Sequence, residues 1–102
     1  DLRNTKVIDI INHLRKYKFN ILVEDSYSDQ KEASSELGVN LTPLDEVEGC
    51  DAIIIAVAHT QYRNLNYSDW KRLLKPNGII VDVKSIFSKK YILKLGYTYW
   101  NL

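Results

Sequence analysis

The sequence predicts an α/β fold with a mainly parallel sheet, and three observations support this prediction. Residues 52–58 are apolar without interruption, which is typical of a strand buried on both faces of a parallel sheet. Shorter aliphatic runs lie on either side of it in the sequence, at residues 19–23 and 79–83. Segments with helical spacing of apolar residues alternate with these runs, and that alternation favours strands joined by helices.

The chain begins with a helical pattern in which Val7, Ile11 and Leu14 share one face. Asn4 or Thr5 can cap this helix, because either side-chain oxygen can accept a hydrogen bond from an amide of the first turn. We expect the helix to run to about residue 18. The aliphatic residues that follow predict a buried strand over 19–25, which ends in two carboxylates.

Weaker signals fill the region before the central run. Charged residues dominate 28–38, so a helix there must be short and lie on the surface, with Gly38 as its end. A brief strand is predicted over 39–41. Thr42 is then expected to cap another short helix, with Pro43 at its first helical position.

The second half gives the clearest alternation. The central strand is predicted from about Cys50 to Ala58, and Ser68 is the expected cap of the next helix. The predicted elements that follow are a turn at residues 75–78, a buried strand at 79–83, a helix that ends at Gly96 and an aromatic edge strand at 97–100.

The first predicted element is a helix, whereas doubly wound domains usually begin with a strand that becomes the middle of the sheet. We therefore expect a Rossmann-like, three-layer domain that lacks its first, central strand. The length of 102 residues fits one domain over 1–102, and the sequence contains no methionine. We expect the chain to be part of a longer protein.

Composition narrows the class of protein. Lys and Arg number 14 against 13 Asp and Glu, spread along the chain, so no basic face points to nucleic acid or an anionic membrane. The longest apolar run is too short to span a bilayer. Cys50 is the single cysteine, which favours a reducing cytoplasm. We expect a soluble, cytoplasmic protein.

Candidate binding residues follow the predicted strands, because ligands of parallel sheets lie beyond the carboxyl ends of the strands. His59 follows the central strand, and Lys84 and Ser85 follow the strand at 79–83. Lys84 is a cation where phosphate-bearing ligands bind, although an exposed lysine at this position can also be merely solvated. Arg3 precedes the first helix, whose positive end favours anions. Asp25 can bind a ribose or cap the next turn.

The sequence gives little support for a phosphate-binding loop, a metal site or a reactive cysteine. The four glycines at 38, 49, 78 and 96 cannot form a glycine-rich phosphate loop, and no cluster has metal-ligand spacing. Cys50 lies at the amino end of its strand and is expected to be a buried structural thiol. His59 is expected to fix its loop by hydrogen bonding, and a catalytic role is the less favoured alternative. We predict no catalytic residue and no metal site.

The chain resembles the C-terminal, UDP-binding domain of the UDP-glucose/GDP-mannose dehydrogenase family. The matching segments, in order, are residues 1–5 (DLRNT), Asp25, residues 56–59 (AVAH), residues 74–84 (LKPNGIIVDVK) and residues 96–100 (GYTYW). Their order and spacing cover essentially the whole chain. The Ala-Val-Ala-His segment and the Tyr-Trp ending are most similar to the branch that oxidises UDP-N-acetylhexosamines for bacterial surface polysaccharides.

The resemblance implies an NAD-dependent UDP-sugar 6-dehydrogenase in which an NAD-binding domain and a central dimerisation region precede this one. Such enzymes oxidise the sugar C6 alcohol to a carboxylate through a cysteine that lies upstream, so Cys50 is not that nucleophile. By the same resemblance Arg3 reaches toward NAD, and Lys84, with Ser85 beside it, contacts the UDP-sugar. The fragment alone is expected to be inactive, and the full-length protein to be a homo-oligomer.

Two other classes stay open from the residues alone. A stand-alone, doubly wound nucleotide- or partner-binding module without catalytic activity would bring Asp25 and Lys84 together around a metal or phosphate. A small methyl or acyl transferase would use the same kind of sheet, but the missing glycine-rich turn disfavours it.

Overall fold

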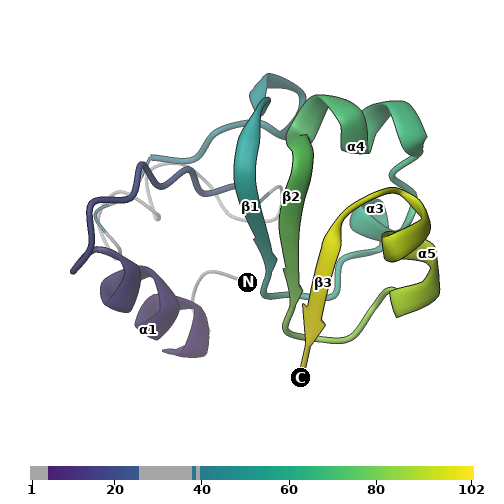
Figure 1. Cartoon of the computed structure of the whole chain (residues 1–102). Helices are drawn as coiled ribbons and strands as arrows, with labels where there is room; N and C mark the ends of the chain where they lie inside the picture. The colour runs from purple at the N-terminus through teal and green to yellow at the C-terminus, as the bar shows by residue number, and fades with distance from the viewer. Residues whose placement is uncertain (1–4, 26–37, 39) are drawn as a thin grey trace. The chain divides into compact units, whose positions relative to one another are not determined.

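The computed structural model describes residues 5–25, 38 and 40–102 (Figure 1). The chain divides into two compact units, Asp1–Val47 and Glu48–Leu102. The second unit holds a parallel sheet with helices packed on it, so the fold is α/β and Rossmann-like, as the sequence predicts. The expected first strand stays a prediction, as does the expectation of one domain.

The first unit is built around helix α1, Thr5–Leu14. Val7 and Ile11 are its buried residues, one turn apart on the apolar face that the spacing predicts. The helix ends earlier than expected: residues 15–18 continue as turns, in which the amide of Tyr17 donates to the carbonyl of Leu14 at 3.0 Å.

The predicted strand over 19–25 is not formed. Within the described part of the chain, Val23 forms an isolated parallel bridge with Leu41, and the amide of Thr42 donates to the Val23 carbonyl at 2.8 Å. Phe19 and Leu22 are 62% and 49% exposed. An aliphatic run forms a strand only when its backbone groups pair with a neighbouring segment over several residues, and among the described residues this segment has the one bridge.

The remaining predictions for this unit are confirmed only in part. The strand over 39–41 is reduced to the same bridge, and the short helix is η1, a 3-10 helix over Leu44–Glu46. Thr42 does not cap it; Pro43 occupies the N-cap position without a side-chain hydrogen bond. The predicted helix over 28–38 lies outside the described residues except for Gly38, which has a φ of +63°.

The sheet of the second unit has three parallel strands in the order β1-β2-β3. Their bounds are Cys50–Ile55 for β1, Leu74–Asp82 for β2 and Thr98–Asn101 for β3. The pairing of β1 with β2 shifts between Cys50 and Ala52, which face Leu74 and Ile79. Residues 75–78, predicted as a turn, lie instead within β2 at this irregularity, where Asn77 takes a φ of +64°.

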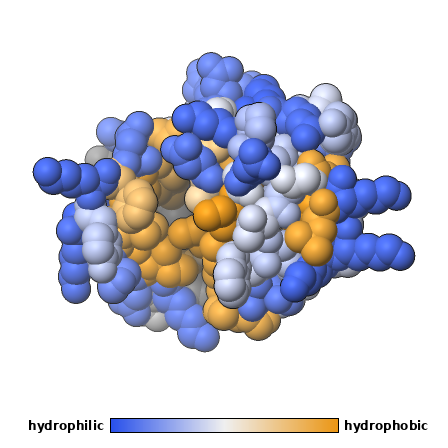
Figure 2. Space-filling view, in the orientation of Figure 1, coloured by the Kyte–Doolittle hydropathy of each residue, from blue (hydrophilic) through white to orange (hydrophobic). Residues whose placement is uncertain are grey.

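The central run is not the doubly buried interior strand that the sequence suggests. Ile55 is 6% exposed and Ile54 is 39% exposed, and β1 pairs only with β2 among the described strands. In this sheet the buried residues are those whose side chains face the helices, and the next residue along each strand points to the opposite face. Apolar residues therefore reach the surface, as Figure 2 shows for one face of the molecule.

Helices α3, Thr60–Arg63, α4, Tyr67–Leu73, and α5, Lys89–Lys94, connect the strands. In Figure 1, α4 and α5 lie on one side of the sheet. The core between these helices and the sheet consists of one apolar cluster: Ile55, Trp70, Leu74, Ile80, Ile92, Tyr97 and Tyr99. The sequence predicts α4, α5 and the edge strand β3, but not α3.

Ser68 is not the N-cap of α4. Asn66 has that place, because its side chain accepts from the amide of Asp69 at 2.9 Å while the Asp69 carboxylate accepts from the amide of Asn66 at 2.9 Å. This reciprocal pair is a capping box. Ser68 instead donates its hydroxyl to Asn66 Oδ1 at 2.8 Å. The expected stop of α5 at Gly96 is confirmed by a φ of +97°.

Candidate functional site

All three strands end at the same edge of the sheet. Ile55 pairs with Asp82, and Asp82 pairs with Asn101, so the last residues of β1, β2 and β3 lie side by side. The amide of Val83 extends this pairing with a 2.9 Å hydrogen bond to the Ile55 carbonyl. The chain then leaves β2 through the turn of residues 83–87, which leads to α5. This edge is where a parallel sheet binds its ligands.

Lys84 lies in that turn and is exposed. A lysine at such a position presents three N–H donors on a flexible stem, which can follow the oxygens of a phosphate. The structure thus places Lys84 at the edge that the sequence predicts, on the solvent side.

Ser85 lies beside it with a φ of +54°, in the left-handed region that few residues other than glycine adopt readily. Its hydroxyl donates to the Leu102 carbonyl at 2.6 Å and accepts from Asn101 Nδ2 at 3.1 Å. The single proton of the Ser85 hydroxyl is therefore already used within the protein. In this arrangement Ser85 anchors the turn to the end of β3, and its backbone rather than its hydroxyl proton is left for a ligand.

Beneath the turn lies a buried polar cluster that the sequence reasoning missed. Asp82 is fully buried, and its Oδ2 accepts from the amide of Phe87 at 2.9 Å and lies 2.6 Å from the hydroxyl of Tyr99. The same hydroxyl lies 2.8 Å from the Phe87 carbonyl. Burial, together with the hydrogen bond and charge of Asp82, raises the pKa of Tyr99 to about 12.

His59 occupies the N-cap position of α3, and its ring centroid lies 5.5 Å from that of Tyr62. The histidine is half-buried, and its side chain makes no capping hydrogen bond. The interpretation of His59 as a residue that fixes its loop by hydrogen bonding stays a prediction.

The remaining candidates lie elsewhere. Arg3 is outside the described residues. Asp25 belongs to the first unit and is 5% exposed. Cys50 is half-buried at the amino end of β1, where burial and then the neighbouring Asp51 charge raise the pKa of its thiol. Within the described ranges no three His, Cys, Asp or Glu residues gather as metal ligands, and no helix there has the length and apolar character to cross a membrane.

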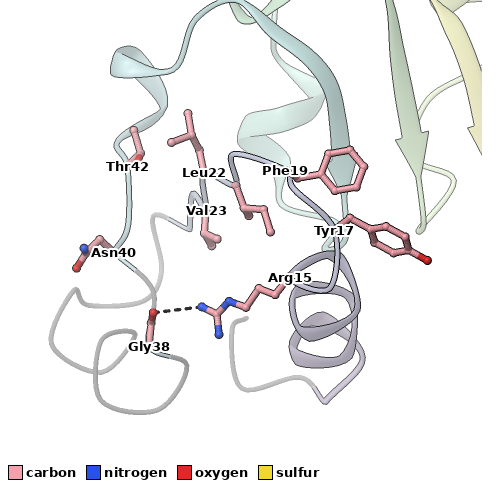
Figure 3. Close-up of a pocket in the computed structure, with 9 residues that line it drawn as sticks. Arg15, Tyr17, Phe19, Leu22, Val23, Gly38, Asn40 and Thr42 are labelled. Carbon is pink, nitrogen blue, oxygen red and sulfur yellow. Dashed lines mark hydrogen bonds between the residues drawn. The ribbon is translucent and has the colours of Figure 1, made fainter.

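The first unit contains a cavity of about 450 Å³, shown in Figure 3. Its described lining is Arg15, Tyr17, Phe19, Ile21, Leu22, Val23, Gly38, Asn40 and Thr42. The Arg15 guanidinium crosses it to donate to the Gly38 carbonyl at 3.2 Å. Neither Lys84 nor Ser85 is among these residues, so the cavity does not coincide with the site predicted from the sequence.

The parallel sheet with its flanking helices defines an α/β, Rossmann-like domain, with the exposed Lys84 in the turn at its carboxyl edge. Residues 1–89 match the UDP-binding domain of the UDP-glucose/GDP-mannose dehydrogenase family. The chain belongs to this family, as its sequence resemblance indicates.

Individual relatives agree with this assignment. The chain is 37% identical to Protein CapL of Staphylococcus aureus over 102 residues, which is all of this chain and 24% of that protein. It is 32% identical to the UDP-N-acetyl-D-glucosamine 6-dehydrogenase of Pseudomonas aeruginosa, over 87% of this chain and 21% of the relative. For the Salmonella typhi protein of the same name the identity is 33%, over 84% of this chain and 20% of the relative. The chain thus spans about a quarter or less of each of these proteins.

Proposed function

We propose that this chain is the UDP-sugar-binding domain of an NAD-dependent nucleotide-sugar 6-dehydrogenase that converts UDP-N-acetylhexosamines to uronic acids. The match of residues 1–89 to the family's UDP-binding domain carries this proposal. The names of the Pseudomonas and Salmonella relatives support the hexosamine class of substrate.

Lys84 is the residue that we assign to the UDP-sugar. It is exposed in the turn that follows β2, at the edge where nucleotide ligands of parallel sheets lie. Its ammonium would neutralise charge on the diphosphate. Ser85 would contribute through the backbone of the same turn, because its hydroxyl proton is engaged by Leu102.

NAD does not fit this chain by itself. The glycines stand at positions 38, 49, 78 and 96, too far apart to form the close-packed loop that binds a dinucleotide pyrophosphate. NAD would therefore be held by another domain of the same enzyme, with Arg3 as this chain's contribution. The nucleophile would also lie outside this chain, so the isolated chain is expected to be inactive.

The wider setting follows from the same proposal. The full-length enzyme would combine NAD-binding and central domains with this one, would form a homo-oligomer in the cytoplasm, and would supply precursors of a surface polysaccharide. No nucleic acid or membrane partner is part of the proposal.

A nucleotide titration tests the proposal. The chain is titrated with UDP, UDP-N-acetylglucosamine, UDP-N-acetylgalactosamine and AMP, while the fluorescence of Trp70 and Trp100 and the melting temperature are followed. Trp100 is a useful reporter because it lies on β3 and is exposed. We expect uridine nucleotides to bind more tightly than AMP.

The matched pair of variants is Lys84→Ala and Lys90→Ala, since both lysines are exposed and Lys90 lies on α5. Loss of a charge-assisted contact should weaken UDP binding about tenfold or more in Lys84→Ala and leave it unchanged in Lys90→Ala. Equal affinities for UDP and AMP, or equal effects of the two variants, would contradict the proposal.

A further inference from the structure

The turn that carries Lys84 is held at Phe87 by two buried side chains, Asp82 from β2 and Tyr99 from β3. The backbone N–H of Phe87 donates to Asp82 Oδ2 at 2.9 Å, and the Tyr99 hydroxyl lies 2.6 Å from the same oxygen and 2.8 Å from the Phe87 carbonyl. Because the hydroxyl has one proton, Tyr99 donates to only one of these two oxygens at a time, and so holds the turn either through Asp82 or through the Phe87 carbonyl. The amide of Ser85 closes the turn at its start, donating to the Asp82 carbonyl at 3.2 Å.

These two side chains are themselves fixed. Asp82 has no exposed surface and Tyr99 is 5% exposed, and both face the core side of the sheet, Tyr99 opposite Ile80 and Asp82 opposite Asn101. A buried carboxylate is costly unless it is hydrogen-bonded. Asp82 Oδ1 has no hydrogen-bond partner among the described residues, so Oδ2 carries all the contacts that the structure shows for this carboxylate. Such a costly group directly after the apolar residues 79–81 indicates a role beyond packing.

We propose that Asp82 and Tyr99 are positioning residues that hold the 83–87 turn in the conformation in which Lys84 meets the nucleotide. This inference rests on the proposed function. Neither residue is proposed to touch the ligand; the two act by fixing the backbone of Phe87, three residues after Lys84, so that binding does not have to order the turn. The raised pKa of Tyr99 agrees with a hydroxyl that stays protonated and can donate throughout the neutral range.

The chain offers a matched control for this proposal. Tyr97 is buried like Tyr99 and lies in the same segment, but its hydroxyl donates to the Trp70 carbonyl on α4 at 3.3 Å, away from the turn. Tyr99→Phe and Tyr97→Phe therefore remove the same atom, from the same residue type, in two different hydrogen-bonded settings.

Two readouts are made on the chain and both variants at a temperature where all are folded: UDP affinity, and amide hydrogen exchange of Ser85 and Phe87 by NMR. In Tyr99→Phe the two amides should exchange about tenfold faster and UDP should bind about five- to tenfold more weakly. Tyr97→Phe should change neither readout, whatever its melting temperature. Asp82→Asn keeps an acceptor oxygen and should retain more affinity than Asp82→Ala.

Any other result would contradict one of the two proposals. Equal effects of Tyr99→Phe and Tyr97→Phe on both readouts would reduce Tyr99 to a stability residue and overturn the proposal. Faster exchange without weaker binding would show that the ligand does not need the ordered turn, and would also overturn it. A wild-type chain that binds no UDP would instead refute the proposed function, and the exchange rates would then show separately whether Tyr99 holds the turn.

Discussion

The adjacent residues Ile79 and Ile80 give the sharpest test of how the sheet is layered. Both lie on β2, but Ile80 has no exposed surface and belongs to the apolar core, whereas Ile79 is 40% exposed on the opposite face. Ile80→Ala removes buried methyl and methylene groups and leaves a cavity against Trp70 and its neighbours, a change that costs about 2–5 kcal/mol. Ile79→Ala removes the same atoms from a partly exposed position and should cost about 1 kcal/mol or less.

The assay is urea unfolding of the two variants and the wild type, followed by tyrosine and tryptophan fluorescence. For a chain of this size a loss of several kcal/mol takes much of the total stability, so Ile80→Ala should shift the midpoint strongly or prevent folding. Ile79→Ala remains informative in either case. Equal midpoint shifts for the two variants, or a larger shift for Ile79→Ala, would refute the assignment of the helix-covered face.

Three further outcomes are expected. Asn66→Ala should lose about 1 kcal/mol of stability through the capping box, whereas Ser68→Ala should lose clearly less, which the two urea midpoints will compare. Gly78→Ala should cost about 1–3 kcal/mol, because an added Cβ would lie 2.4 Å from Leu74 Cγ at a buried position of β2; an unchanged melting temperature would disprove this. The pKa of Tyr99 is raised from 10.0 to about 12, so the folded state holds this proton more tightly than the unfolded state, and the stabilisation is complete below pH 10 and lost as the pH rises toward 12. Tyr99→Phe should lack this part of the pH dependence in alkaline unfolding curves, and identical curves would contradict it.

The sequence predicts the second unit well because its signals are local. The spacing of Trp70 and Leu73 and the aliphatic run before Asp82 each determine an element without help from distant residues, whereas the turn expected at 75–78 lies within β2. The N-cap of α4 could also have been predicted from the sequence. Asn66 followed three residues later by Asp69 is the pattern of a capping box. Ser68 was predicted instead because it lies closer to the apolar residues of the helix.

The failures depend on contacts between distant residues. A largely apolar run such as residues 19–23 can form a strand only if another segment pairs with it. Whether it is paired depends on residues far away in the sequence. Ile54 is a second example. Its apolar side chain predicts burial, but in the sheet it is 39% exposed.

The candidate site likewise has one part that could be predicted from the sequence and one that could not. That Lys84 and Ser85 follow a strand end could be predicted from the order of elements, and the structure places both at the carboxyl edge. The cluster of Asp82 and Tyr99 could not, because the two residues are 17 positions apart and meet only when β3 adds to β2 in parallel register. The engagement of the Ser85 hydroxyl by Leu102 depends on the same pairing.

The central claim is that UDP binds at the carboxyl edge of the sheet, and NMR chemical-shift mapping of the chain with added UDP tests it most directly. We predict that the amides of 57–60 and 83–87 shift on titration, while those at the amino ends of β1 and β2, 49–51 and 74–75, stay in place. Added AMP should produce smaller shifts at the same edge. Shifts confined to the amino ends or to the cavity beside Arg15, or no shifts with UDP, would contradict the account.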